Sequence, residues 1–225
     1  MDLNGDGVDD LISGQYSPGV VNVWFGSKKG FSEKITLQEK ADEAGKTTSM
    51  MSTANFVDWD GDGDLDMIVG DVTGGIKLNI NNGTQLLPKF GVRQPLMLNG
   101  KPMKGAGKTD PMAVDWDGDG DLDVLAGTEA GDVFFYRRQQ DGSFAHPVSA
   151  LTGKSRPDIS YSSVKKALKS EGVDIGYRLR IDVADWDGDG HLDLLVGNCR
   201  RVDQKTIGEV RVYLRRKTVV PGSNP

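Results

Sequence analysis

The alternation of apolar and polar residues predicts short β-strands along most of the chain. Segments 20–25 (VVNVWF) and 76–80 (IKLNI) change between apolar and polar side chains with the period of two that a half-buried strand requires. Glycine-, asparagine- and serine-rich stretches between such runs are typical of tight turns. Segment 162–170 (SSVKKALKS) instead has helical spacing, with Val164 and Leu168 four residues apart. The pattern therefore indicates an all-β chain with one short helix.

The expected strands form four groups with the same internal order. In each group a strand precedes an acidic loop and further strands follow it across tight turns, except that the first group begins directly with the loop. The expected strands cover residues 11–14, 20–25, 31–37, 53–59, 65–70, 76–80, 90–96, 112–116, 122–127, 133–137, 144–151, 179–186, 192–197 and 209–214. Small antiparallel sheets of this kind do not bury both faces alone, so we expect them to stack face to face.

A nine-residue acidic motif marks each group. It reads DLNGDGVDD from Asp2, DWDGDGDLD from Asp58 and Asp115, and DWDGDGHLD from Asp185, at spacings of 56, 57 and 70 residues. A period in this range suits one four-stranded unit per repeat. We therefore predict a single all-β domain, a β-propeller of four-stranded antiparallel blades. Its repeat units are expected at about residues 1–51, 52–109, 110–177 and 178–225.

Charge is distributed unevenly along the 225 residues. The formal net charge is −6, but the four motifs hold 18 of the 33 acidic residues and none of the 27 basic ones. Carboxylates crowded into nine residues repel one another unless a cation lies among them. A solvated charged turn is the alternative interpretation, and the fourfold recurrence argues against it. The single cysteine, Cys199, excludes an internal disulfide framework.

The chemistry of the motif favours calcium. Calcium takes six to eight oxygen ligands in a flexible shell, whereas zinc and copper prefer softer donors. Positions 1, 3, 5 and 9 supply side-chain oxygens, position 7 can supply a backbone carbonyl, and glycine at position 6 permits a sharp bend. We predict up to four Ca²⁺ ions in a structural role. The predicted ligands are Asp2, Asn4, Asp6, Val8 and Asp10; Asp58, Asp60, Asp62, Asp64 and Asp66; Asp115, Asp117, Asp119, Asp121 and Asp123; and Asp185, Asp187, Asp189, His191 and Asp193.

The repeated loops, each followed by an apolar strand that ends in glycine, resemble FG-GAP or VCBS repeats. Phe25-Gly26 stands where the name-giving pair would be, and Asn81-Asn82, Tyr136-Arg137 and Leu214-Arg215 stand there in the other repeats. The resemblance implies a calcium-loop β-propeller like that of the integrin α-subunit or of bacterial surface and secreted proteins. Propellers of that family commonly have seven blades. With four repeats and no strand before its first loop, this chain is expected to be a fragment, a four-bladed ring or part of an assembly.

Large aromatic residues recur with the motif. Trp59, Trp116 and Trp186 share position 2, where a ring of tryptophans could bind sugars. We favour packing between blades, because burial is the ordinary use of a large aromatic side chain. His191 is expected to point to solvent, since position 7 needs its backbone carbonyl alone.

Several function classes are disfavoured by the sequence. No nucleophile–histidine pair or phosphate loop can be placed, and basic residues form scattered pairs rather than a stripe, so we expect neither an enzyme nor nucleic-acid binding. No apolar run is long enough to span a membrane, and no signal peptide is visible. Calcium sites of modest affinity would fill outside the cytoplasm, which predicts a secreted or cell-surface protein.

We therefore predict a non-enzymatic calcium-binding propeller that acts as an extracytoplasmic binding or adhesion module. Its protein or glycan ligand is expected on the face opposite the calcium loops, where long connections gather. These connections are residues 38–52, 97–110, 152–177 and 198–208. The alternatives are a polysaccharide-acting enzyme or enzyme-associated propeller, and a structural spacer in a larger surface protein.

Overall fold

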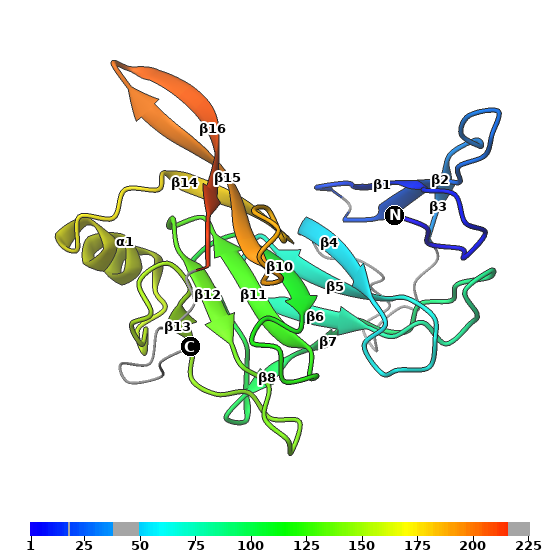
Figure 1. Cartoon of the computed structure of the whole chain (residues 1–225), viewed down its shortest axis with the longest axis horizontal. Coiled ribbons are helices and arrows are strands. Elements are labelled where there is room, and N and C mark those ends of the chain that lie inside the picture. Colours follow the sequence, from blue (N-terminus) through cyan, green and yellow to red (C-terminus); the bar gives the residue numbers. More distant parts are fainter. Residues whose placement is uncertain (18, 38–49, 216–225) are drawn as a thin grey trace.

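The computed structural model describes residues 1–17, 19–37 and 50–215, which form four larger antiparallel sheets in sequence order and one two-stranded sheet (Figure 1). The first sheet contains β1 (Leu11–Gly14), β2 (Val21–Trp24) and β3 (Ile35–Thr36). The second contains β4 (Met51–Val57), β5 (Asp66–Asp71), β6 (Ile76–Asn79) and β7 (Gln94–Pro95). The third contains β10 (Thr109–Val114), β11 (Asp123–Thr128), β12 (Val133–Tyr136) and β13 (Val148–Ser149). The fourth contains β14 (Tyr177–Ala184), β15 (Asp193–Val202) and β16 (Lys205–Tyr213).

The all-β class and the antiparallel sheets are confirmed. Each acidic loop leads into β1, β5, β11 or β15. In the second, third and fourth sheets the loop joins this strand to the strand before it, β4, β10 or β14, which lies at one edge of its sheet. We call β4, β10 and β14 the innermost strands. The outermost strands β3, β7 and β13 have two residues each and are shorter than the sequence predicted. Pro95 in β7 and Pro147 just before β13 lack a backbone N–H, which limits strand pairing at these positions.

Two connections contain more structure than the sequence indicated. Segment 97–110 includes a hairpin of β8 (Met97–Leu98) and β9 (Lys101–Pro102), and Asn99 and Gly100 form its turn with φ of 50° and 73°. Asn-Gly is the pair that a two-residue turn with positive φ favours. The predicted helix is α1 (Tyr161–Ser170), with Ser160 as its N-cap.

The predicted long loop at residues 198–208 is wrong, because these residues extend β15 and β16 into one long hairpin. Backbone pairing continues from Asn198 opposite Glu209 to Val202 opposite Lys205. Asp203 and Gln204 close the hairpin with φ of 48° and 64°, without the glycine that usually identifies such a turn. Of the predicted connection at 38–52, residues 38–49 lie outside the part of the chain that the structure describes.

Three hydrophobic clusters lie between neighbouring sheets. Val21 and Val23 of β2 pack with Met67 and Val69 of β5 between the first and second sheets. Ile68, the residue between these two, points the other way and packs with the third sheet. Val124 and Ala126 of β11 face the second sheet, while Leu125 faces the fourth. Alternate residues of β5 and β11 thus belong to different interfaces, which explains why every residue of both strands is buried.

Glycine at the end of a strand allows close approach of the next sheet. A Cβ at Gly70 would overlap the carbonyl oxygen of Thr109 in β10, and one at Gly127 would lie 3.0 Å from Ile181 of β14. Side chains then link the innermost strands. Asn55 donates to the carbonyl of Pro111 at 2.6 Å, and Asp110 accepts the N–H of Ile181 at 2.7 Å.

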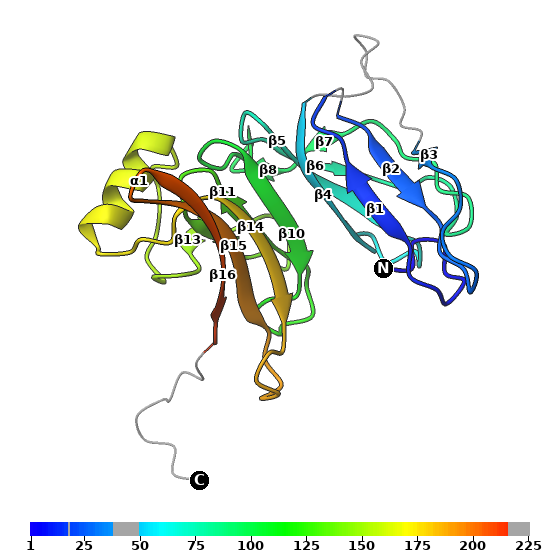
Figure 2. The same ribbon diagram turned by 90° about the horizontal axis from the view of Figure 1, so that it is seen from above.

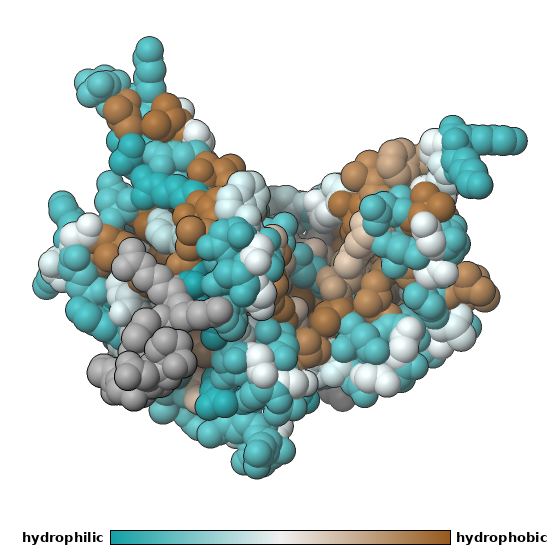
Figure 3. All heavy atoms as spheres, viewed as in Figure 1, coloured by the Kyte–Doolittle hydropathy of each residue, from teal (hydrophilic) through white to brown (hydrophobic). Residues whose placement is uncertain are grey.

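Within the described residues, the four sheets follow one another as an open series and do not close into a ring. The first and fourth sheets lie at opposite ends in both ribbon views (Figures 1 and 2). A hollow of about 550 Å³ lies along β1, β4, β10 and β14. Figure 3 shows apolar surface on the walls between the two ends. The described helix, α1, is too short and too polar to cross a membrane.

Candidate metal loops

The aspartate at position 9 of each motif joins three segments of its repeat. One carboxylate oxygen of Asp66 accepts the N–H of Trp59, in the acidic loop, at 3.0 Å, and the other accepts that of Asn81, just after β6, at 2.8 Å. We call these two hydrogen bonds the position-9 latch. The latch recurs in every repeat: Asp10 accepts from Leu3 and Gly26, Asp123 from Trp116 and Arg138, and Asp193 from Trp186 and Arg215.

The latch residues are buried, and burial affects their acidity. Burial raises the pKa of Asp66 and of Asp123, although the backbone N–H donors of the latch counteract part of that rise. In the fourth repeat the backbone N–H of Arg215 lowers the pKa of Asp193. Buried backbone donors without a partner are costly, so this aspartate has a structural role whether or not an ion is bound. The sequence motif had suggested metal ligation alone for position 9, and the latch was not predicted.

Positions 1 and 5 fold the loop upon itself. The carboxylate of Asp115 accepts the N–H groups of Gly118 at 2.8 Å, Asp119 at 3.1 Å and Gly120 at 3.0 Å. Asp119 in turn accepts the N–H of Asp121 at 3.1 Å. In every repeat, position 1 accepts the N–H of position 6, and position 5 accepts that of position 7. Both glycines of each loop have positive φ, which confirms the sharp bend.

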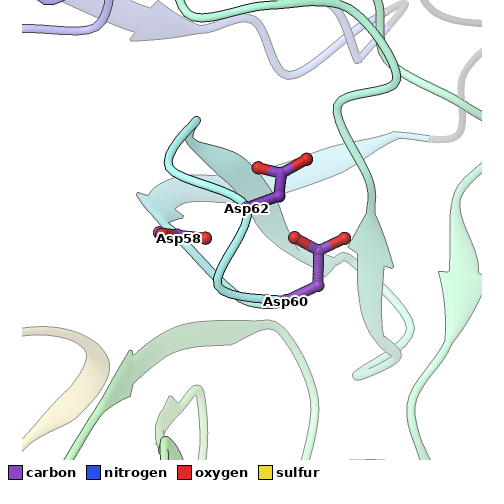
Figure 4. A group of neighbouring side chains, drawn as sticks. All are labelled: Asp58, Asp60 and Asp62. Atoms are coloured by element: carbon purple, nitrogen blue, oxygen red, sulfur yellow. The ribbon is translucent and has the colours of Figure 1, made fainter.

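Carboxylates gather in three of the four loops. Oxygen atoms of Asp58, Asp60 and Asp62 lie within 4.8 Å of one another on the loop between β4 and β5 (Figure 4). The equivalent groups elsewhere are Asp115, Asp117 and Asp123, and Asp185, Asp187 and Asp193. Asp66, Asp119 and Asp189 lie outside these three groups. The first loop, with Asp2, Asp6 and Asp10, has Asn4 at position 3, and its amide donates to Asp6 at 3.3 Å.

Position 7 differs among the repeats. Val8 and Asp121 are partly exposed and His191 is exposed, as expected if the backbone alone is used. Asp64 is buried instead, and burial raises its pKa, followed in effect by the charge of Asp62. Its Oδ1 is buried without a hydrogen-bond partner among the described residues. This carboxylate therefore has a different environment from its three counterparts.

A cation would satisfy an otherwise isolated oxygen in the third loop. Oδ1 of Asp117 is buried and has no hydrogen-bond donor among the described residues. Asp117 belongs to the carboxylate group with Asp115 and Asp123. A buried carboxylate oxygen without a donor is unfavourable. Its surroundings, made of hard oxygen atoms, suit calcium or magnesium better than a soft metal.

The third loop also contains an arginine that sequence reasoning missed. Nε of Arg137 lies 2.6 Å from Oδ2 of Asp117, and its Nη2 lies 2.9 Å from Oδ2 of Asp119. The backbone N–H of Asp121, followed by Arg137, lowers the pKa of Asp119. Strand pairing and the latch place Arg137 at the position that Phe25, Ile80 and Leu214 occupy in the other repeats. The third repeat alone therefore has a positively charged side chain at this position. The name-giving pairs of the second and third repeats are therefore Ile80-Asn81 and Arg137-Arg138, one residue away from the predicted ones.

The tryptophans at position 2 are not equivalent. Trp59 packs on Phe144 of the third sheet, with ring centroids 6.4 Å apart, and Arg138 covers its ring at 4.8 Å. Arg215 of the fourth sheet covers Trp116 at 5.1 Å. Trp186 is 61% exposed. Packing between sheets therefore holds for the first two, whereas Trp186 has no following sheet among the described residues.

A pocket of about 380 Å³ lies beside α1, at the ends of the strands remote from the acidic loops. Its apolar lining consists of Ala130, Leu168, Val173 and Ile175. The rim carries Lys165 and Lys169, one helical turn apart, and neither has an ion-pair partner within the described ranges. The rim also contains Gly131, Gly172, Asp174 and Gly176. The predicted connection 152–177 thus helps to form a concave surface.

Comparisons with known proteins agree with the repeat pattern. The FG-GAP-like repeat family matches residues 2–69 and 115–196. A solved Agrocybe aegerita lectin structure, described as recognising non-reducing terminal N-acetylglucosamine, is similar, with 19% identity and a TM-score of 0.42. That match covers 90% of this chain and 52% of the lectin chain, so this chain spans about half of its length. No curated protein matches the chain significantly in sequence.

The latch predicts that position 9 stabilises the fold without calcium. Asp123→Asn replaces one acceptor oxygen with an amide that faces an N–H donor. We expect the free energy of unfolding to fall by about 2–4 kcal/mol, measured by urea denaturation in EDTA. The control is Asp121→Asn in the same loop, where we expect a change below about 0.5 kcal/mol. Equal effects of the two substitutions would contradict the latch.

Proposed function

The chain belongs to the FG-GAP-like repeat family, and we propose that it is a calcium-stabilised β-propeller module that binds a protein or glycan ligand outside the cytoplasm. The observation that carries the calcium role is the recurrence of carboxylate groups in the second, third and fourth loops. The buried Oδ1 of Asp117 supports it, because a cation would supply the missing partner. In this proposal the module catalyses no reaction.

Calcium would reinforce a loop that already has the right shape. Backbone N–H groups orient the carboxylates at positions 1 and 5, and the latch anchors the loop to two strands. An ion there supplies positive charge that offsets the repulsion among the carboxylates. Loops of modest affinity fill where calcium is millimolar, which supports an extracytoplasmic location.

The third loop should bind calcium more weakly than the second and fourth. The guanidinium of Arg137 already bonds to Asp117 and Asp119, and its charge repels an incoming ion. Phe25, Ile80 and Leu214 occupy the same place in the other repeats and carry no charge. We propose that Arg137 partly replaces the ion, so that this loop stays folded when calcium is scarce.

The pocket beside α1 is the proposed ligand site. It combines an apolar lining with two ammonium groups that have no ion-pair partner within the described residues, a combination that suits a ligand with an acidic group. Asp174 is the one acidic residue of its lining, and its side chain accepts the N–H of Gly176 at 3.3 Å. The surrounding framework is fixed, since α1 buries Val164 and Leu168, and Gly172, just after its C-cap Glu171, has φ of 73°.

Calcium removal should lower thermal stability. Free calcium at a concentration one hundred times the Kd of a site adds about 2.7 kcal/mol to the free energy of unfolding. We therefore expect EDTA to lower the Tm by roughly 5–10 °C for each site that is occupied at such a concentration. Added calcium should restore the Tm. Asp189→Ala should reduce the calcium-dependent shift by one site, and His191→Ala in the same loop should not. A melting curve that EDTA leaves unchanged would overturn the calcium role.

Arg137→Leu should tighten calcium binding to the third loop. In a background that carries Asp6→Ala, Asp62→Ala and Asp189→Ala, which leaves the third loop alone intact, we expect calorimetry to show an affinity roughly tenfold higher than with Arg137 present. Arg137→Lys, which keeps the charge and loses the fork geometry, should fall between the two. Unchanged or weaker binding by Arg137→Leu would mean that the arginine orients the carboxylates instead of competing with the ion.

The ligand site is tested with the calcium-loaded chain on an array of neutral and acidic glycans and peptides. We expect acidic members to bind, and Lys169→Glu to reduce their binding at least tenfold because it reverses the charge at the rim. Lys166→Glu is the matched control, since it lies on the same helix and does not line the pocket. Binding that is insensitive to Lys169→Glu would place the ligand elsewhere.

A further inference from the structure

A contact between aromatic and apolar side chains recurs at the first two interfaces between sheets. The position-2 residue of one acidic loop packs against a phenylalanine after the third strand of the next repeat. Trp59 packs in this way on Phe144. Leu3 and Phe90 share one hydrophobic cluster and are both buried.

Backbone hydrogen bonds establish which phenylalanines are equivalent. The residue after Phe90 donates its N–H to the carbonyl of Ile80 at 2.8 Å, and the residue after Phe144 donates to Arg137 at 2.9 Å. In the first repeat, Ser32 donates in the same way to Phe25 at 2.8 Å. Phe31 is therefore the counterpart of Phe90 and Phe144, which are both buried.

The two ends of the series each hold half of this contact. Phe31, in the first repeat, is 61% exposed, because no described sheet precedes it. Trp186, in the fourth repeat, is also 61% exposed, because no described sheet follows it. Among the described residues no charged group or aromatic ring lies over Trp186, in contrast to Trp59 and Trp116. One chain thus carries both partners of such a packing contact, Trp186 at one end of the series and Phe31 at the other.

The outer face of the fourth sheet repeats the apolar pattern of a buried interface. Strand pairing places Leu195, Val210 and Val212 where the third sheet has Leu125, Val133 and Phe135. Leu125 and Val133 are fully buried under the fourth sheet, whereas Val210 is 74% exposed. We call Trp186, Leu195, Val210 and Val212 the outgoing face.

The outer face of the first sheet is its complement. Leu11 occupies the place of Met67 and Val124, which are fully buried against a preceding sheet, yet Leu11 is 49% exposed. Trp24 lies opposite Leu11 on β2 and points to the same side. We call Leu11, Trp24 and Phe31 the incoming face. The first and fourth sheets, which carry these two faces, lie at opposite ends of the series (Figure 2).

We propose that two copies of this chain associate head to tail, with the outgoing face of one packed on the incoming face of the other. The three interfaces within the chain are the template, because each joins an outgoing face to an incoming one through equivalent strand positions. The first two interfaces also include the phenylalanine, Phe90 or Phe144, which has no counterpart among the described residues of the fourth repeat. A contact between two different faces is heterologous, and it forms twice in a pair whose two open series close into one ring. The inference is independent of the metal and of the ligand pocket.

Sedimentation velocity on the calcium-loaded chain over a concentration series tests this proposal. We expect a species of twice the 24.3 kDa chain mass at high concentration. Trp186→Ser and Phe31→Ser should each weaken the association at least tenfold, because large buried aromatic residues dominate interfaces of this kind. Leu87→Ser is the control, since Leu87 is 72% exposed and lies on neither face. Circular dichroism melts confirm that each variant is folded.

Mixing the two variants distinguishes head-to-tail from symmetric association. The Phe31→Ser copy keeps its outgoing face and the Trp186→Ser copy keeps its incoming face, so an equimolar mixture recovers one intact contact. We expect the mixture to form a pair more readily than either variant alone. A wild-type chain that stays monomeric, a pair that both substitutions leave intact, or a mixture without recovery would each overturn the proposal.

Discussion

The position-9 latch is the interaction on which each repeat depends. A single buried carboxylate accepts one N–H from the acidic loop and one from the residue after the third strand, and it does so four times. Because a buried donor without a partner is costly, aspartate at this position fixes the loop against two strands at once. The loop is thereby held in a shape in which carboxylates converge, before any ion enters. Metal binding in our account strengthens an existing structure and does not create it.

Stacking of the sheets follows from the same repetition. The strands after the second and third loops, β5 and β11, are buried on both faces, so their alternate residues supply two different interfaces. An interior sheet therefore needs a neighbour on either side. The outer faces of the first and fourth sheets have no neighbouring sheet among the described residues. The proposed self-association and the proposed ligand binding use different parts of the molecule, because no residue of the incoming or outgoing face lines the pocket beside α1.

Much of this arrangement could be predicted from the sequence. Motif spacing gave the four sheets, alternation gave most strands, and the spacing of Val164 and Leu168 gave the buried side of α1. The hairpin at 198–208 was missed because its turn, Asp203-Gln204, lacks glycine. The latch was missed because a carboxylate in an acidic loop suggests a metal ligand, and its backbone partners lie seven residues before and fifteen or more after it. Arg137 was missed for a similar reason, since only strand pairing brings it to Asp117 and Asp119.

Hydrogen–deuterium exchange with and without EDTA tests the central claim most directly. Amides bonded to position 9, such as those of Trp59 and Asn81, belong to the latch, whereas amides bonded to position 1, such as that of Gly63, belong to the acidic loop itself. We predict that chelation accelerates exchange at Gly63 and at Gly190 while the latch amides stay protected. Equal loss of protection at both sets would show that the latch needs the ion. No change at either set would show that the loops hold no ion that matters to their structure.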